Sequence, residues 1–368
     1  VIGQLSHGGA ERQLYELARH LPSEGIKPTV ICLSEADDPY GRLLRQAGIE
    51  VVTMSRRMRV EPGRIGRLIR VLREKRVHLA HSYLFGASAY TSAAAWWLGL
   101  PFLPAVRSFG QGRAFVLRTV DRIVLRRGRL VLANSRDVAA WVEKGLGVPG
   151  AQIRVVSNGL DLPRFTCIPD MKAGRDSCTV VGSISLFKPQ KRIHFLLEVA
   201  GNLKSRGRRF RFRLLGDGAE WERCRESRDK MGLQDCVELP GRTDDVASEL
   251  AGLHIFVLAS DREGMPNAVM EAMAAGRPVV ATRVPGTAEI VEDGVTGLLV
   301  PPDDVDRFAG ALETLMDDPG LAGSLGRAGR RRAVVMFPLE RMVQETVQVY
   351  RELLGRGLQK EEREEQGG

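Results

Sequence analysis

The sequence is poor in cysteine, and its few cysteines show no pattern typical of a metal site or a disulfide framework. They are odd in number and lie far apart, at Cys32, Cys167, Cys178, Cys224 and Cys236. None of their spacings is that of paired metal ligands. We therefore expect reduced thiols in a cytoplasmic protein, with no metal site and no cysteine nucleophile.

Long apolar runs are lacking as well. The stretch from Ala87 to Val106 comes nearest, but polar residues, glycine and proline interrupt it. A transmembrane helix needs roughly 18–20 uninterrupted apolar residues, so we expect a buried helix followed by a strand. We also expect no signal peptide. There is no initiator methionine either, and Val1-Ile2 is typical of the end of a strand, so we expect a few residues to precede it.

Acidic residues are scarce in the first half. Through Arg164 the formal charge is +12, the remainder is −3, and the whole chain is +9. A basic half indicates an anionic partner: nucleic acid, phospholipid headgroups or a phosphorylated acceptor. Because basic and aromatic residues do not interleave and no reader motif occurs, we expect no nucleic acid.

One basic segment has a pattern typical of a membrane surface. Arg113–Arg129 places Phe115, Leu117, Val120, Val124 and Leu125 among six arginines, and Arg56–Arg76 is basic too. This composition suits the anionic inner leaflet of the plasma membrane, with the protein cytoplasmic or peripheral on that face. The alternative is a helix whose apolar residues enter the core and whose basic back is solvated.

Short β-branched runs alternate with amphipathic helical stretches, which predicts parallel sheets covered by helices. In the first half the expected strands are Pro28–Ser34, Ile49–Met54, Val77–Ser82, Phe102–Val106, Leu130–Ala133 and Ile153–Val156. In the second half they are Thr179–Val181, Phe210–Leu215, Val237–Leu239, His254–Leu258, Pro278–Thr282 and Leu298–Val300. The expected fold class is therefore α/β, with two Rossmann-like, doubly wound domains facing each other across a cleft.

The domain boundaries follow from composition. Residues 162–176 contain proline, glycine and charge without periodicity, which is typical of a linker. We expect an N-terminal domain over residues 1–165 and a C-terminal domain over 166–336. A final helix over 337–358 would pack back toward the first domain, and 359–368 would form a flexible tail because it lacks apolar anchors.

The segment from Ser260 to Pro278 has the strongest functional pattern. It follows a buried strand, Pro266 suits the first turn of a helix, and Gly276 suits its C-terminal cap. The amino end of such a helix binds phosphate through backbone N–H groups and the helix dipole. The carboxylates of Glu263 and Glu271 could each take a pair of vicinal hydroxyls. The alternative is a loop carboxylate and a solvated helix residue.

A second anion-binding element runs from Val181 to Arg192, between a strand and the helix expected over Lys191–Lys204. A lysine at a helix start can neutralise a departing diphosphate, and Lys191 is the better candidate, ahead of Lys188.

Gly216-Asp217-Gly218 follows the next strand but lacks the third glycine of a dinucleotide fingerprint, which argues against NAD. Asp304-Val305-Asp306 resembles a metal-binding pair, but its place before a helix predicts N-capping.

As a set these motifs resemble the family 4 glycosyltransferases of the GT-B fold. The resemblance rests on Glu263-Gly-Met-Pro-Asn followed by Glu271, then on Gly276–Thr282, Gly286, Glu289–Val291 and Asp293–Pro302. Upstream it includes His7–Glu11 and Asn158-Gly159 with Asp161 and Phe165. The likeness therefore extends over nearly the whole chain.

The resemblance implies roles for particular residues. Glu271 would bind the ribose hydroxyls, Glu263 would hold the sugar, and backbone of Gly264, Met265, Pro266 and Asn267 would contact sugar and diphosphate. Lys191 would face the diphosphate; Ser183 replaces an arginine usual in the family, and Arg192 could supply that charge. Gly216 would form a wall of the nucleotide pocket.

The first half is assigned roles in the same way. Gly8 and Gly9 would form a flexible loop over donor and acceptor, although a plain turn is the alternative. Arg107 follows a strand where many relatives carry a histidine that contacts the donor sugar, so this chain departs from the family there. His81 closes a strand at the cleft edge and is either a site residue or a structural histidine.

The implied reaction is transfer of a sugar from a UDP- or GDP-sugar, with retention of anomeric configuration and without a metal or other cofactor. The acceptor would be a glycan or a lipid-linked saccharide of cell-envelope or exopolysaccharide synthesis. Two alternatives are a GT-B nucleotide-sugar epimerase and a nucleotide-sugar- or lipid-binding scaffold without turnover. Incubation with donor alone distinguishes the epimerase, and Glu263→Gln distinguishes the scaffold.

Overall fold

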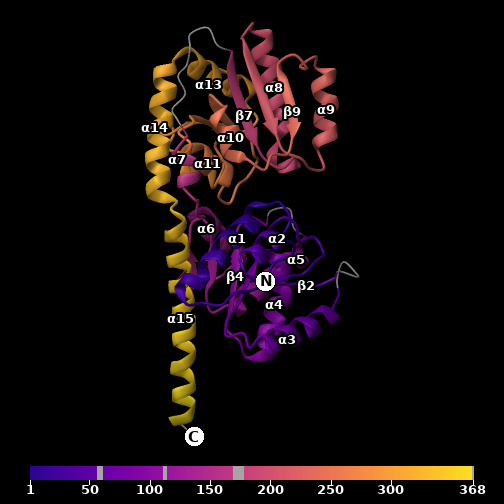
Figure 1. Cartoon of the computed structure of the whole chain (residues 1–368), viewed down its shortest axis with the longest axis vertical. Coiled ribbons are helices and arrows are strands. Elements are labelled where there is room, and N and C mark those ends of the chain that lie inside the picture. The colour runs from indigo at the N-terminus through magenta and orange to yellow at the C-terminus, as the bar shows by residue number, and fades with distance from the viewer. Residues whose placement is uncertain (56–60, 111–113, 169–177, 367–368) are drawn as a thin grey trace. The chain divides into compact units, whose positions relative to one another are not determined.

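The computed structural model describes residues 1–55, 61–110, 114–168 and 178–366, with side chains as far as residue 355. It divides into two compact units, shown in Figure 1. Unit 1 contains Val1–Gly159 and Leu339–Gly368, and unit 2 contains Leu160–Pro338. All paired strands in the described residues are parallel. The α/β fold class expected from the alternating pattern is therefore confirmed.

The division falls six residues earlier than the boundary predicted after residue 165. Leu160 donates its N–H to the carbonyl of Phe337 at 2.9 Å, and Phe165 is fully buried in the core of unit 2. Residues 160–165 therefore belong with the second unit. The predicted linker extends over residues 169–176, which lie outside the described residues.

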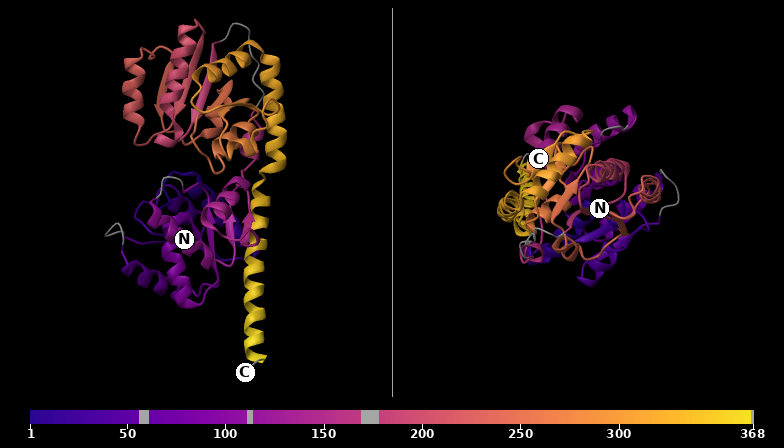
Figure 2. Two further views of the ribbon diagram at one scale, coloured as in Figure 1. Left: turned by 180° about the vertical axis from the view of Figure 1, so that it is seen from behind. Right: turned by 90° about the horizontal axis from the view of Figure 1, so that it is seen from above.

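The last helix is longer than predicted. Helix α15 spans Leu339–Gln366 and so continues through most of the segment expected to be a tail; Figure 2 shows it as one continuous helix. Glutamate, lysine, arginine and glutamine are good helix formers, so the charged end needs no apolar anchors to stay helical. Nearer its start, Val343 and Val347 pack into one core with Leu14 and Leu17 of unit 1.

Unit 1 contains two parallel sheets. One pairs β1 (Thr29–Cys32) with β2 (Glu50–Thr53). The other has the order β3-β4-β5-β6, formed by Ala80–Tyr83, Phe102–Val106, Val131–Ala133 and Ile153–Val155. Ile2 bridges to Cys32, and the Val1 carbonyl accepts from Tyr83 N at 2.9 Å. The first two residues therefore lie between β1 and β3.

The helices of unit 1 follow its strands in the order that the periodicity predicts. Helix α4 packs against both α3 and α5, and its small residues Ala94 and Ala95 are fully buried. Besides α15 the helices are α1 (Gly9–His20), α2 (Tyr40–Gln46), α3 (Gly63–Glu74), α4 (Leu84–Leu98), α5 (Phe115–Arg127) and α6 (Arg136–Leu146), with short 3₁₀ turns η1 (Leu21–Glu24) and η2 (Gly150–Gln152).

Unit 2 has a single six-stranded sheet of order β12-β11-β10-β7-β8-β9. Its strands are β7 (Thr179–Ile184), β8 (Phe210–Leu215), β9 (Val237–Gly241), β10 (Ile255–Leu258), β11 (Val279–Thr282) and β12 (Leu298–Val300). This is the Rossmann order, in which the chain winds outward from the centre in both directions. The order reverses between β7 and β10, which pair through Ile255 with Val181.

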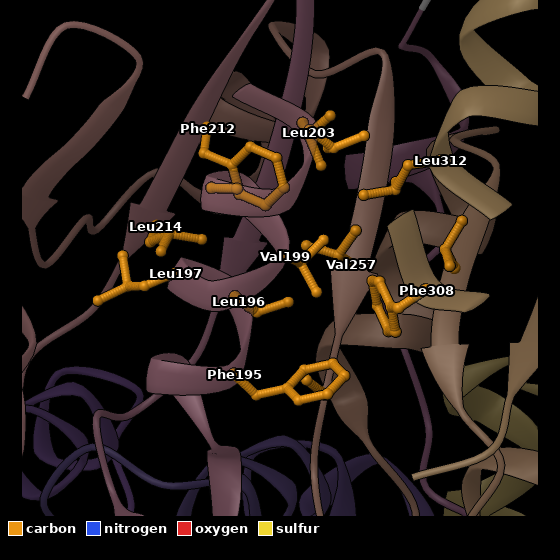
Figure 3. Packing of buried hydrophobic residues seen from close by; sticks show 14 of the residues in the cluster. Phe195, Leu196, Leu197, Val199, Leu203, Phe212, Leu214, Val257, Phe308 and Leu312 are labelled. Atoms are coloured by element: carbon orange, nitrogen blue, oxygen red, sulfur yellow. The ribbon is translucent and has the colours of Figure 1, made fainter. Parts of the chain in front are cut away.

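Helices cover the sheet of unit 2. They are α7 (Pro163–Thr166), α8 (Ile193–Ser205), α9 (Trp221–Lys230), α10 (Val246–Ala251), α11 (Asn267–Ala274), α12 (Thr287–Ile290), α13 (Val305–Asp317) and α14 (Pro319–Met336), with the 3₁₀ turn η3 (Pro189–Lys191). Figure 3 shows how Phe195, Leu196 and Leu203 of α8 pack with Phe212 of β8 and Phe308 of α13. Val181 of β7 belongs to the same core, and the segment between β7 and α8 belongs to the site described next.

Candidate active site

The carboxyl ends of β7 and β10 define the expected ligand position in unit 2. In open α/β sheets, ligands bind outside the carboxyl ends of the strands where the strand order reverses. Here β7 leads into residues 185–192 and β10 leads into residues 259–266, and both segments hold the site residues expected from sequence. The topology therefore brings together two segments about 70 residues apart.

Lys191 and Glu263 form the closest contact between these two segments. Lys191 Nζ lies 2.5 Å from Glu263 Oε1, and only 21% and 8% of the two side chains are exposed. Next to this pair, the side-chain amide of Gln190 donates to the Arg262 carbonyl at 2.6 Å, and the backbone carbonyl of Gln190 accepts from Asp261 N at 2.9 Å. Three contacts therefore hold the lysine and the glutamate in place on the two loops.

Helix α8 starts two residues later than predicted, so Lys191 precedes the helix rather than opening it. Lys191 ends the 3₁₀ turn η3, and α8 begins only at Ile193. Arg192 separates the two with a left-handed backbone, φ 50°, which interrupts the helix that sequence predicts from Lys191. Lys188, the second candidate, is exposed.

The Arg192 side chain points to other acids. Its Nε lies 3.1 Å from Asp261 Oδ1, a terminal nitrogen pairs with Asp303, and its guanidinium lies 4.9 Å from the ring centroid of Phe195. Ser183, at the end of β7, is 1% exposed, and its hydroxyl has no hydrogen-bond partner in the part of the chain that the structure describes. Lys191 is thus the site cation paired with Glu263.

The loop from Glu263 to Pro266 is buried and shaped by a glycine from another segment. Glu263 is 6% exposed and Met265 also 6%, and Gly264 and Pro266 are buried with them. Gly286 has φ 79°, and a Cβ there would lie 2.2 Å from the Glu263 carbonyl oxygen. Only glycine allows the backbone to approach this closely.

Helix α11 starts at Asn267, and its N-cap residue Pro266 provides no side-chain cap. The dipole of a helix favours an anion at its amino end. Glu271, one turn inside, is 3% exposed. The alternative of a solvated helix residue is therefore wrong, because a carboxylate buried to this degree must be paired or hydrogen-bonded.

The backbone of Gly216 lies close against the loop that follows β7. Its φ is 142°, and a Cβ there would lie 1.8 Å from the Ser185 carbonyl oxygen. Ser185 N donates to Leu215 O at 3.0 Å, and Phe187 N donates to Asp217 O at 2.7 Å. The turn after β8 thus holds the loop that leads to Lys191.

Asp304 acts as predicted at a helix start. Its carboxylate accepts from Arg307 N at 2.9 Å and caps α13. Among the described residues no group of three or more histidine, cysteine or acidic side chains could hold a metal ion.

Unit 1 has its own polar group at the carboxyl ends of β3 and β4. Arg107 Nη2 donates to Asn158 Oδ1 at 2.5 Å, its guanidinium lies 5.2 Å from the ring centroid of Tyr83, and its carbonyl accepts from Asn134 at 3.3 Å. Burial lowers the pKa of Arg107, while Tyr83 and Glu11 raise it. Arg107 thus stands at the centre of a buried polar cluster.

Gly8 and Gly9 lie at the start of α1. Gly8 is its N-cap, and Gly9, expected in the loop, is the first helical residue. A Cβ at Gly8 would lie 2.1 Å from a carboxylate oxygen of Glu11. Gly8 therefore leaves room for the buried carboxylate of Glu11, one of the charges that acts on Arg107.

His81 lies inside unit 1, between two tyrosines. Its Nδ1 lies 2.7 Å from the Tyr350 hydroxyl, and its ring centroid lies 4.7 Å from that of Tyr83. Burial lowers the pKa of His81 well below its usual value of 6.5, and the charge of Arg107 adds to this effect. These contacts favour the structural alternative for this histidine.

The His81 shift predicts acid sensitivity. Below pH 6.5, His81 is protonated in the unfolded chain but stays neutral in the folded chain. The free energy of unfolding therefore falls as pH decreases, by about 1.4 kcal/mol per pH unit for one such group. We expect His81→Gln to remove this part of the decrease in the free energy of unfolding between pH 7.5 and pH 5.5, measured by urea titration. His78→Gln, at an exposed position, is the control. Identical pH dependence in wild type and His81→Gln would contradict the assignment.

Sequence reasoning missed several residues that shape these sites. Gln190, Tyr83 and Asn134 each make contacts that no motif marks, because their partners lie far away in the sequence. Gly286 was noted only as part of the family resemblance; its place in a Pro-Gly-Thr turn after a strand was the available signal.

Two family models match the chain in succession. The model described as "Glycosyltransferase Family 4" matches residues 7–164, and the one described as "Glycosyl transferases group 1" matches residues 175–318. Together they extend over most of the chain, with a boundary between them close to that between the two units.

Named relatives and solved structures agree with these models. WcaL of Salmonella typhimurium, named for colanic acid biosynthesis, is 36% identical over 51% of this chain and 48% of its own length. LpsE of Rhizobium meliloti, named for lipopolysaccharide core biosynthesis, is 32% identical over 51% and 55%. The chain thus spans about half the length of these relatives.

The fold is shared over nearly the whole chain with solved glycosyltransferase structures. Anabaena HepE, in complex with UDP-glucose, has a TM-score of 0.84 at 21% identity and matches 95% of this chain and 98% of its own. A glycosyltransferase from Rickettsia africae has a TM-score of 0.82 at 19% identity, over 96% and 97%. This chain belongs to the family 4 glycosyltransferases and has their GT-B fold of two Rossmann-like units.

Proposed function

We propose that this glycosyltransferase moves a sugar from a UDP- or GDP-sugar to a saccharide or lipid-linked acceptor of cell-envelope or exopolysaccharide synthesis. The observation that carries the proposal is the pair of Lys191 and Glu263 at the reversal point of the unit 2 sheet, followed along the chain by the buried carboxylate of Glu271 in α11. The relatives named for colanic acid and lipopolysaccharide core synthesis support the class of acceptor. The HepE complex with UDP-glucose supports the class of donor.

In this proposal the diphosphate lies at the start of α11 and faces Lys191. Glu271 accepts from the ribose hydroxyls and Glu263 from the sugar hydroxyls, with Gly264 and Asn267 offering backbone contacts. Lysine and the helix start supply the positive charge that a departing diphosphate needs, so the reaction requires no metal.

The transfer breaks the bond between the anomeric carbon and the diphosphate oxygen and forms a bond from the same carbon to the acceptor oxygen on the same face. The departing phosphate oxygen takes the proton of the acceptor hydroxyl. No side chain then acts as nucleophile, and Lys191 stabilises the negative charge that develops on the leaving group.

Donor binding tests the proposal directly. We expect UDP or GDP, titrated calorimetrically in the presence of EDTA, to bind wild type, and Glu271→Gln to raise the Kd about 10- to 100-fold. The loss of charge-assisted hydrogen bonds from two ribose hydroxyls is the reason. The substitution keeps the volume of the buried side chain, so folding should be retained.

Glu226→Gln, on the exposed surface of α9, is the matched control and should bind as wild type does. If Glu271→Gln binds both nucleotides as tightly as wild type, the assignment of the ribose site is wrong.

Incubation of wild type with the matching nucleotide-sugar alone should leave the configuration of the sugar unchanged. An isomerised sugar would indicate an epimerase.

A further inference from the structure

Helix α5 exposes apolar side chains that a solvated surface helix would not carry. Only Asp121, Val124 and Leu125 of this helix are buried. Val116, Val120 and Ile123, spaced at i, i+4 and i+7, are 70%, 40% and 50% exposed and therefore form one stripe along the helix. The alternative of a helix whose apolar residues enter the core therefore holds only for Val124 and Leu125.

The apolar surface extends beyond this stripe. Phe115 begins α5 and is 84% exposed. Trp96 and Trp97, near the end of α4, are 69% and 66% exposed, and α4 packs against α5. The guanidinium of Arg127 lies 5.8 Å from the ring centroid of Trp96, which places Trp96 at the end of the same face, with Trp97 next to it in the chain. We call Phe115, Val116, Val120, Ile123, Trp96 and Trp97 the apolar patch.

Arginines border the patch. Arg118, Arg122 and Arg126 are spaced by four residues and form a parallel stripe on α5. Arg118 and Arg126 donate to the carbonyls of Gly145 and Gly147. A carbonyl carries no formal charge, so these hydrogen bonds do not neutralise the two arginines. Asp121 is the only acidic residue between positions 75 and 136, and it is buried. The exposed face is therefore both apolar and strongly basic.

We propose that the apolar patch and its arginines bind the surface of an anionic phospholipid bilayer. Contiguous exposed apolar residues mark an interaction site, and a basic amphipathic helix with tryptophan at its edge matches the headgroup region of a membrane. Each arginine near an anionic leaflet adds attraction that salt screens. A positively charged border favours a negatively charged bilayer over a second copy of this basic surface. No helix in the described residues is long and apolar enough to cross a membrane.

Vesicle sedimentation tests the proposal on the whole chain. We expect wild type to bind phosphatidylcholine vesicles containing phosphatidylglycerol, to bind vesicles of phosphatidylcholine alone much more weakly, and to dissociate as salt rises. The triple variant Val116→Ser, Val120→Ser, Ile123→Ser should bind the anionic vesicles at least about tenfold more weakly, because three side chains no longer bury apolar surface. The matched control Val334→Ser, Val335→Ser removes exposed valines of α14 and should bind like wild type.

Tryptophan fluorescence gives a second readout. Trp96 and Trp97 should shift to shorter wavelength when anionic vesicles are added, whereas Trp96→Phe, Trp97→Phe should lose the shift and keep most of the binding. Nucleotide binding by the triple variant, measured as above, should stay unchanged, so a failure of membrane docking is distinguishable from a failure of the proposed glycosyl transfer.

Three results would overturn the proposal. Wild type could fail to bind anionic vesicles, or the triple variant could bind them as well as the α14 control does. Sedimentation velocity could also show self-association of wild type that the triple variant loses, in which case the patch serves a second copy of the chain.

Discussion

Replacing Lys191 with methionine is expected to lower kcat about 100- to 1000-fold, because a preorganised charge that faces a developing anion contributes this much to a reaction. Methionine keeps the length and the apolar stem of the side chain, so the substitution removes the charge with little change in packing. Lys191 Nζ lies 2.5 Å from Glu263, and the donor would meet a lysine already held in position. The rate is measured as glycosyl transfer at saturating donor.

The matched control is Lys188→Met. Lys188 lies three residues away on the same loop and is exposed, so its loss should change kcat by less than about threefold. If Lys188→Met loses activity while Lys191→Met retains it, the diphosphate lies against Lys188 and the proposed geometry is wrong. Thermal unfolding of both variants separates a loss of stability from a loss of catalysis.

Glu263→Gln extends this experiment to the pair. We expect the double variant with Lys191→Met to be about as slow as the slower single variant, because residues that act as a unit in one transition state are not additive. If the rate losses of the two single variants multiply in the double variant, the two side chains act independently, and the proposal that they form one unit is wrong.

The strand–loop–helix segment around Glu263 could be predicted from sequence because its signals are local. Proline at the helix start, glycine at its end and a β-branched strand before it all lie within residues 254–278. Helix α11 spans Asn267–Ala274, between the proline and the glycine that mark its two ends in the sequence. Gly276 has the positive φ of a C-cap, 70°.

The position of Lys191 could be predicted less well because it depends on tertiary contacts. A left-handed conformation costs an arginine about 1–2 kcal/mol, so sequence favours a helix that continues through Arg192. Its contacts with Asp261, Asp303 and Phe195 offset this cost. Those partners are up to 111 residues away, and nothing in the local pattern indicates them.

Helix α14 is a helix that the sequence pattern does not reveal. Its glycines weaken the helical pattern, so the sequence does not predict this helix. Gly326 is required by packing, because a Cβ there would lie 2.2 Å from the Gly276 carbonyl oxygen. The residue that obscures the helix in the sequence is thus the one that lets α14 approach the end of α11.

Gly286→Ala is expected to lower kcat/KM about 100-fold, a loss of the size that a misplacement of 1 Å in a catalytic group produces. The alanine Cβ would lie 2.2 Å from the Glu263 carbonyl oxygen and 2.6 Å from that of Gly264. Both atoms are backbone, so they cannot move aside as a flexible side chain would, and the loop that carries Glu263 must shift. Steady-state kinetics with varied donor gives the value.

Gly294→Ala provides the matched control. Gly294 has φ 73°, close to the 79° of Gly286, but its added Cβ would have no atom within 4 Å. Both variants therefore share the backbone strain of a left-handed alanine, about 1–2 kcal/mol, and only Gly286→Ala displaces Glu263. We expect similar activity for Gly294→Ala and wild type, with a Tm lower by a few degrees. Equal kinetic losses in the two variants would show that strain alone explains the effect, and the position of the Glu263 loop would then be irrelevant to catalysis.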